Sequence, residues 1–143
     1  MNNGPENRMN LFAYGTLIDP EIMRRAACEL PRRGWGTLRD YERRALKGKS
    51  YPGLREQSGS FVRGVVYFDV SRPAWERLDR FEGDRYAKKE VTVLLDDGST
   101  ALAWVYLTTP LFLCELSEDG WDYEEFRREG KADFQELYEG FDE

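Results

Sequence analysis

Short blocks of apolar and polar residues alternate along the chain, and turn-forming residues separate them. Residues 60–70 (SFVRGVVYFDV) are rich in β-branched and aromatic side chains, which predicts a strand. Gly64 within it marks either a bulge or a place where another segment passes close. Residues 86–95 and 100–107 predict two more strands, and the DDGS sequence between them is typical of a hairpin turn. Asp96 and Asp97 also suggest a magnesium site, but a hairpin tip offers few further oxygen ligands, so the turn is favoured.

Three segments carry apolar residues at helical spacing beside capping residues. Asp19 followed by Pro20 predicts the start of one helix, and Ser71 predicts the start of a second over residues 72–81. Asp122 begins the third, which Gly130 divides into two pieces. The positions expected to face the core are Ile22, Met23, Ala26, Ala27, Trp75, Leu78, Phe81, Phe126, Phe134 and Leu137.

The remaining segments are less regular. Residues 35–47 alternate unevenly, which predicts a strand with a bend, whereas SYPG at 50–53 predicts a turn or loop. Strands outnumber helices and fall in hairpin-like pairs. We therefore expect an α+β fold, a small closed or strongly curved mixed β-barrel flanked by short helices. With 143 residues, the chain fits one domain over residues 10–143 after a flexible N-terminal tail at 1–9.

Composition narrows the possible partners. Aromatic residues make up 14% of the chain, which favours a core or pocket rich in rings. The net charge of −6 argues against a nucleic-acid partner, and we interpret the arginine pairs at 24–25, 32–33 and 43–44 as solvated surface. No apolar run reaches membrane-spanning length and no secretion signal is recognisable, so we expect a cytoplasmic protein without a membrane partner. The sequence leaves the oligomeric state open.

The chain contains no histidine. Histidine is the commonest general base and metal ligand, so zinc hydrolase sites of the usual type and Ser-His or Cys-His nucleophiles are excluded. A carboxylate, tyrosine or lysine must therefore move the proton if this chain is an enzyme.

A candidate binding loop follows the first predicted strand. Leu11 to Ala13 form an apolar run that ends at Tyr14 or Gly15, as expected of a strand buried on both faces. Gly15 either adopts a positive φ or lets another group approach the main chain closely. The N–H groups of the next residues are then available to an anion. An ordinary strand-to-helix turn is the alternative.

Glu82 is the candidate base. It falls at the predicted C-terminus of a helix, where the helix dipole disfavours negative charge, and Asp79 and Asp84 are near in sequence. Phe81 adds an apolar neighbour. Each feature raises the pKa of the carboxyl, which makes it a better base near neutral pH. The alternative is a solvated glutamate at a helix end.

Two of these stretches resemble one known family. The strings YGTL at 14–17 and LDRFEG at 78–83, followed by Tyr86, are similar to the gamma-glutamylcyclotransferase-like family in its small single-domain branch, the gamma-glutamylamine cyclotransferase type. YPG at 51–53, GVVY at 64–67, AWVY at 103–106 and the segment from Trp121 extend the resemblance over most of the chain. The order and spacing of these strings, rather than any one of them, carry it.

The resemblance implies a barrel-like fold and an activity. Members of this family release 5-oxoproline from gamma-glutamyl amides without a metal or organic cofactor, by attack of the substrate's α-amino group on its γ-carbonyl. Motif by motif, it implies Glu82 as acid and base. The implied substrate-binding residues are Tyr14, Gly15, Thr16 and Leu17 around the glutamyl head, with Tyr51, Tyr86 and Tyr106 near the pocket. Lys88 stands where the family often has an arginine, and lysine does not make the same forked contact.

Other functions remain open on the sequence. The main alternative is a non-catalytic small-ligand or protein-interaction domain of the same fold, because a fold does not fix an activity. A nucleotide-binding domain is disfavoured because the chain lacks GxGxxG and Walker spacing. The leaving amine is also open: gamma-glutamyl amino acids, gamma-glutamyl-lysine isopeptides, glutathione and biosynthetic intermediates share the same glutamyl head.

Overall fold

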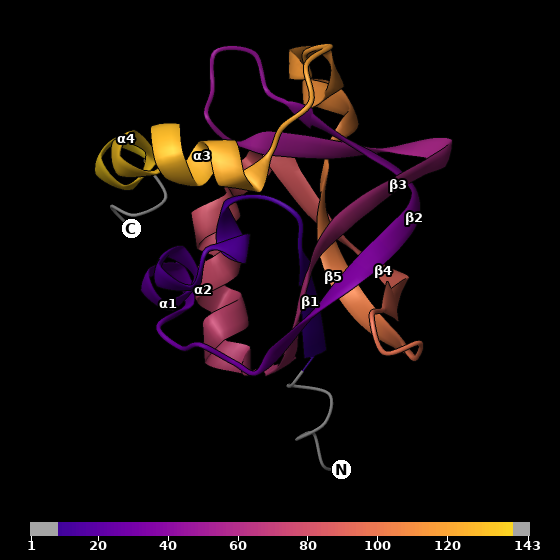
Figure 1. Ribbon diagram of the computed structural model, residues 1–143. Helices are drawn as coiled ribbons and strands as arrows, with labels where there is room; N and C mark the ends of the chain where they lie inside the picture. Colours follow the sequence, from indigo (N-terminus) through magenta and orange to yellow (C-terminus); the bar gives the residue numbers. More distant parts are fainter. Residues whose placement is uncertain (1–8, 139–143) are drawn as a thin grey trace.

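The computed structural model describes residues 9–138, and Figure 1 shows its arrangement. The strands are β1 (Met9–Ala13), β2 (Arg33–Ala45), β3 (Pro52–Val70), β4 (Tyr86–Leu95) and β5 (Thr100–Thr108). The helices are α1 (Pro20–Ala27), α2 (Arg72–Glu82), α3 (Tyr123–Glu129) and α4 (Lys131–Leu137). Short 3₁₀ turns are η2 (Thr16–Ile18), η3 (Gly83–Arg85) and η4 (Pro110–Glu115).

The strands close into a barrel in the order β1-β3-β2-β4-β5. β1 pairs parallel to β5 through Leu11 and Trp104, while the other neighbours are antiparallel. Closure removes the free sheet edges that would otherwise need protection. The expected α+β mixed barrel with short helices is therefore confirmed.

β1 lies between two cores, which explains its uninterrupted apolar sequence. Because side chains alternate along a strand, Leu11 and Ala13 join the core between barrel and helices, whereas Phe12 and Tyr14 join the core inside the barrel. All four are buried. The loop that follows β1 therefore starts in the interior of the molecule.

The helices start where their capping residues predict. α1 and α2 lie side by side along the barrel, and α3 and α4 lie above them in Figure 1. The Asp19 carboxylate accepts hydrogen bonds from the N–H groups of Glu21 and Ile22, and Ser71 Oγ accepts one from Ala74. Gly130 separates α3 from α4 as expected.

The β2–β3 hairpin is longer than predicted. β3 begins at Pro52, so the proposed turn at 50–53 overlaps its first residues, and the strand predicted at 60–70 is only its second part. The reason is that residues 55–59 are polar and exposed, which leaves no apolar alternation to recognise, although Arg55 and Glu56 pair with β2. The expected bend is confirmed at Asp40, whose φ is 68° and whose carboxylate accepts a hydrogen bond from Gly59 N–H.

The N-terminal residues, the side chain of Leu137 and the turn at 96–99 were also subjects of sequence predictions. Met9, expected in a tail, is the first residue of β1, and residues 1–8 and 139–143 lie outside the described residues. The side chain of Leu137 also lies outside them. Asp96 pairs with Arg63 and Asp97 accepts hydrogen bonds from Ser99, which fits the hairpin turn. Between residues 9 and 138, no helix combines the length and apolar character needed to cross a membrane.

Candidate active site

Gly15 is required by a close contact rather than by an unusual φ. Its φ is −130°, which other residues can adopt. A Cβ built on Gly15 would lie 2.9 Å from Pro52 Cγ and 3.0 Å from Pro52 Cδ. The first residue of β3 therefore packs directly on the loop. Of the two explanations that the sequence allowed for this glycine, the close approach of another group is confirmed and a positive φ is not.

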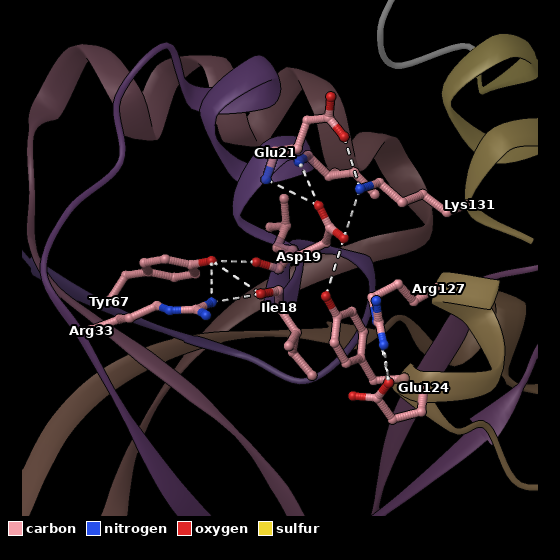
Figure 2. A network of polar contacts seen from close by, with 11 residues as sticks. Ile18, Asp19, Glu21, Arg33, Tyr67, Glu124, Arg127 and Lys131 are labelled. Carbon is pink, nitrogen blue, oxygen red and sulfur yellow. Dashed lines mark hydrogen bonds and ion pairs between the residues drawn. The ribbon is translucent and has the colours of Figure 1, made fainter.

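Side chains from the barrel hold the carbonyl oxygens of this loop. The Tyr67 hydroxyl donates a hydrogen bond to Leu17 O at 2.6 Å, and Arg33 donates one to Ile18 O at 2.7 Å, as Figure 2 shows. A loop that leaves the sheet needs such donors because its carbonyls have lost their strand partners. Arg33, interpreted from the sequence as solvated surface, thus supports the candidate site.

Tyr14 is fixed at both its backbone and its side chain. Arg43 donates a hydrogen bond to Tyr14 O at 2.8 Å, and the Tyr14 hydroxyl donates one to Tyr106 O at 2.6 Å. Arg43 is half-buried, so its interpretation as solvated surface is wrong, whereas Arg33 is an exposed residue that also makes a hydrogen bond to the loop. Charge clustering in the sequence gave no sign of these contacts, because both acceptors are backbone oxygens distant in the chain.

Asp19 links the loop to the C-terminal helices (Figure 2). Only 2% of the residue is exposed, and besides capping α1 its carboxylate accepts a hydrogen bond from the Tyr123 hydroxyl at 3.1 Å. Lys131 Nζ lies 3.0 Å from Asp19 Oδ2 and 2.8 Å from Glu21 Oε1. α4 is thereby attached to the end of the loop.

One cavity, here called the inner cavity, brings together the residues predicted for the site. Its lining contains every one of them: Tyr14, Gly15, Thr16, Leu17, Tyr51, Glu82, Tyr86 and Tyr106. Sequence reasoning did not assign to the site the other residues that line it: Leu11, Phe12, Ala13, Pro52, Phe81, Phe134 and Tyr138. The YGTL loop and the LDRFEG string, about 65 residues apart in the chain, therefore face the same space.

Aromatic rings from the C-terminal segment complete the wall. Tyr51 makes edge contacts with Phe134 and Tyr138, with ring centroids 5.8 and 5.2 Å apart, and Phe134 stacks on Tyr138 at 4.5 Å. Phe134 and Tyr138 are four residues apart, a spacing that on a helix is typical of core packing. Nothing in the sequence distinguished these two rings from ordinary core residues.

Glu82 occupies the last position of α2, and Gly83, with a φ of 78°, turns the chain away. Burial, and to a lesser extent the nearby Asp79 carboxylate, raise the pKa of Glu82 to about 8. A carboxyl with this pKa is partly ionised near neutral pH and can both accept and return a proton.

Three tyrosines of the inner cavity keep their hydroxyl protons near neutral pH. Burial raises the pKa of Tyr14, Tyr86 and Tyr106 well above the ordinary value, and the nearby Glu82 charge adds to each shift. Tyr86 donates its hydroxyl proton to Pro52 O at 2.7 Å. These hydroxyls therefore act as fixed donors, whereas the Glu82 carboxyl titrates near neutral pH.

A second hollow, here called the outer cleft, opens on the other side of Glu82. It shares Tyr51, Phe81, Glu82, Tyr86, Phe134 and Tyr138 with the inner cavity. Its other lining residues are Gly48, Lys49, Ser50, Arg80, Gly83, Asp84, Arg85 and Asp133. Glu82 thus lies where an inner cavity beside the glycine loop meets a cleft with charged walls.

The structure is thus a closed mixed barrel in which a glycine loop and a carboxyl of raised pKa line one cavity. The family model described as gamma-glutamyl cyclotransferase, AIG2-like matches residues 11–128. The chain belongs to this family.

Individual relatives agree with this assignment. The chain is 27% identical to AIG2-like protein D of Arabidopsis thaliana over 99% of its own length and 93% of the relative's. It is 32% identical to AIG2-like protein C of the same plant, covering 87% of this chain and 73% of the relative. A solution structure of an Arabidopsis thaliana protein superimposes with a TM-score of 0.70 at 28% identity, covering 91% of this chain and 87% of that one.

Proposed function

We propose that this protein releases 5-oxoproline from a gamma-glutamyl amide, with Glu82 as general base and then general acid. The observation that carries the proposal is the position of Glu82. Glu82 lines the same cavity as the Tyr14–Leu17 loop, and burial with the nearby Asp79 charge raises its pKa to about 8. Membership in the family supports cyclotransferase chemistry in general.

The reaction is an intramolecular acyl transfer. The α-amino nitrogen of the substrate forms a bond to its own γ-carbonyl carbon, and the bond from that carbon to the leaving nitrogen breaks. Glu82 takes the proton that the attacking nitrogen loses and gives it to the departing amine. Because both reacting groups belong to one molecule, the protein mainly has to hold them in an attacking geometry.

The raised pKa suits this proton transfer. An α-amino group in a peptide titrates at about 8, and the free α-carboxylate beside the amino group of a gamma-glutamyl head raises its pKa above that value. A Glu82 pKa of about 8 therefore lies much nearer to it than that of an ordinary carboxyl, which lowers the thermodynamic cost of the proton transfer. A solvated glutamate with a pKa near 4.5 would accept the proton far less readily.

The two hollows suggest how the substrate lies. The glutamyl head would enter through the outer cleft, about 460 Å³ in volume, and push into the inner cavity, which at about 30 Å³ holds only a water molecule or two and would have to widen. There the first turn of η2 leaves N–H groups of the loop without intrahelical partners. Those N–H groups would bind the α-carboxylate or the developing oxyanion. The leaving amine would extend past Glu82 into the outer cleft, which lets one carboxyl reach both nitrogens.

The test is a panel of gamma-glutamyl amides with chemically different leaving amines, assayed for 5-oxoproline by mass spectrometry. Wild-type protein should release it from at least one amide, and Glu82→Gln should lower that rate by roughly 10²–10⁴-fold, the usual range for a lost acid–base group. Glu76→Gln is the matched control, since Glu76 lies on the same helix but lines neither hollow.

Calorimetric binding of the best amide separates the enzyme from a non-catalytic binding domain of the same fold. The proposal requires that Glu82→Gln still binds the amide while turnover collapses. A wild-type protein that binds the amide without releasing 5-oxoproline, or a Glu82→Gln variant with wild-type turnover, would contradict it.

A further inference from the structure

Asp79 connects three elements beside Glu82 without lining either hollow. It lies three residues before Glu82 on α2, so the two carboxyls share one face of the helix. Its Oδ1 accepts a hydrogen bond from the Tyr106 hydroxyl of β5 at 2.7 Å. The residue is thus joined to a wall of the inner cavity as well as to the helix that carries the candidate base.

The second oxygen of Asp79 is paired with Lys88 of β4. Lys88 Nζ lies 3.1 Å from Asp79 Oδ2, and it also lies 4.9 Å from the centroid of the Trp75 ring. Lys88 is the residue that stands where relatives in the resemblance often have an arginine. Its ammonium binds here as a single point charge to one carboxylate.

We propose that Asp79 is a positioning residue for Glu82, and that Lys88 is its counter-charge. Asp79 holds the Tyr106 hydroxyl as its own donor, which keeps that hydroxyl from donating to the Glu82 carboxylate. Its negative charge, partly offset by Lys88, sets the electrostatic field in which Glu82 gains and loses its proton. The inference depends on the proposed function only in the part of its test that measures enzyme rates.

Other titratable or charged groups line the two hollows that Glu82 lines. Around the inner cavity these are the tyrosines Tyr14, Tyr51, Tyr86, Tyr106 and Tyr138, of which Tyr14, Tyr86 and Tyr106 have a pKa raised well above the ordinary value. Around the outer cleft they are charged and of both signs: Lys49, Arg80, Asp84, Arg85 and Asp133. Asp79 differs from them because it is the carboxylate whose charge raises the pKa of Glu82.

The proposal predicts opposite shifts in the pKa of Glu82 when Asp79 or Lys88 loses its charge. Asp79→Asn removes a negative charge and keeps the shape, so the protonation midpoint of Glu82 should fall by roughly half a unit to one unit. Lys88→Gln removes the positive charge that offsets Asp79, so the midpoint should rise. The effects should shrink at high salt, because the side chains of Asp79 and Lys88 are 48% and 33% exposed.

The experiment is a pH titration of the Glu82 carboxyl by ¹³C NMR in protein labelled at glutamate side chains, with Glu82→Gln identifying the resonance. Glu76→Gln and Lys89→Gln are matched controls, because they remove the same charges from α2 and β4 at positions paired with Arg72 and Glu56. The controls should leave the midpoint unchanged.

Shifts of opposite sign for Asp79→Asn and Lys88→Gln support the proposal. Equal shifts in the same direction, or shifts no larger than those of the controls, overturn it. The titration needs no substrate, so it can fail or succeed independently of the proposed function. Where 5-oxoproline release is measurable, the acidic limb of its pH profile should move in step with the NMR midpoint.

Discussion

Gly15 and Pro52 are in contact where the loop after β1 meets the start of β3, and there is no room between them for a methyl group: a Cβ on Gly15 would lie 2.9 Å from Pro52 Cγ. Gly15→Ala should therefore push apart the loop and the strand. We expect a loss of about 1–3 kcal/mol in the free energy of unfolding, the usual cost of overpacking.

The same change should lower 5-oxoproline release more than its cost in stability explains, because Pro52 O also accepts the Tyr86 hydroxyl in the cavity wall. Denaturant unfolding and steady-state rates on folded protein separate the two effects. Gly120→Ala is the control for adding a methyl group, since a Cβ on Gly120 would meet nothing within 4 Å, its φ is not positive, and it lines neither hollow. A Gly15→Ala variant with unchanged stability and activity would contradict the contact.

The raised pKa of Glu82 also makes stability depend on pH. Between its ordinary value of 4.5 and about 8, the folded protein keeps a proton that the unfolded chain has released. Because the folded state then binds more protons, the contribution of Glu82 to stability is complete below pH 4.5 and is lost as the pH rises through 8.

Glu82→Gln removes this dependence. Its free energy of unfolding relative to wild type should increase steadily from pH 5 to pH 9, by roughly 2–3 kcal/mol once allowance is made for solvent near a partly buried carboxyl. Urea unfolding of both proteins at several pH values measures it. A difference that stays constant over this range would mean that Glu82 has an ordinary pKa.

Lys131 tests the attachment of the C-terminal helices to the loop. Its ammonium pairs with Asp19, whose side chain is 3% exposed, so Lys131→Met leaves a buried carboxylate with only its helix-cap and Tyr123 partners. We expect a loss of about 1–3 kcal/mol in stability. Lys47→Met, at an exposed position, should change stability by no more than about 0.5 kcal/mol.

The Lys131 variant should also raise KM for a gamma-glutamyl amide, because α4 carries Phe134 and leads directly to Tyr138, and both rings line the inner cavity. The comparison is made on protein that is folded at the assay temperature. Should KM stay at the wild-type value while stability falls, α4 would support the fold without shaping the site.

Much of this fold could be predicted because the signals are local. The apolar run before Gly15, the caps at Asp19, Ser71 and Asp122, and the hairpin at 96–99 all depend on neighbouring residues. The first part of β3 could not be predicted in the same way, because residues 55–59 are exposed and polar. This part of β3 is held by the pairing of residues 52–56 with β2, which the sequence does not display.

The two motifs of the candidate site could be predicted from the sequence, whereas the residues that hold those motifs in place and complete the cavity wall could not. Glu82 and the 14–17 loop were recognised from short strings whose meeting in one cavity needed the structure. Arg33 and Arg43 escaped recognition because their partners are carbonyl oxygens, which every residue has. Phe134 and Tyr138 escaped because a cavity wall made of rings has the same helical spacing as a core.

The most direct test of the central claim is the pH dependence of kcat/KM for 5-oxoproline release between pH 5 and pH 10. If Glu82 is the base, the rate should rise with pH as its carboxyl ionises and level off above a midpoint of about 8, and this limb should vanish from the residual activity of Glu82→Gln. A wild-type profile that is flat through pH 8 would show that another group moves the proton. The same conclusion would follow if Glu82→Gln kept a limb that the α-amino group of the substrate, titrated separately, does not account for.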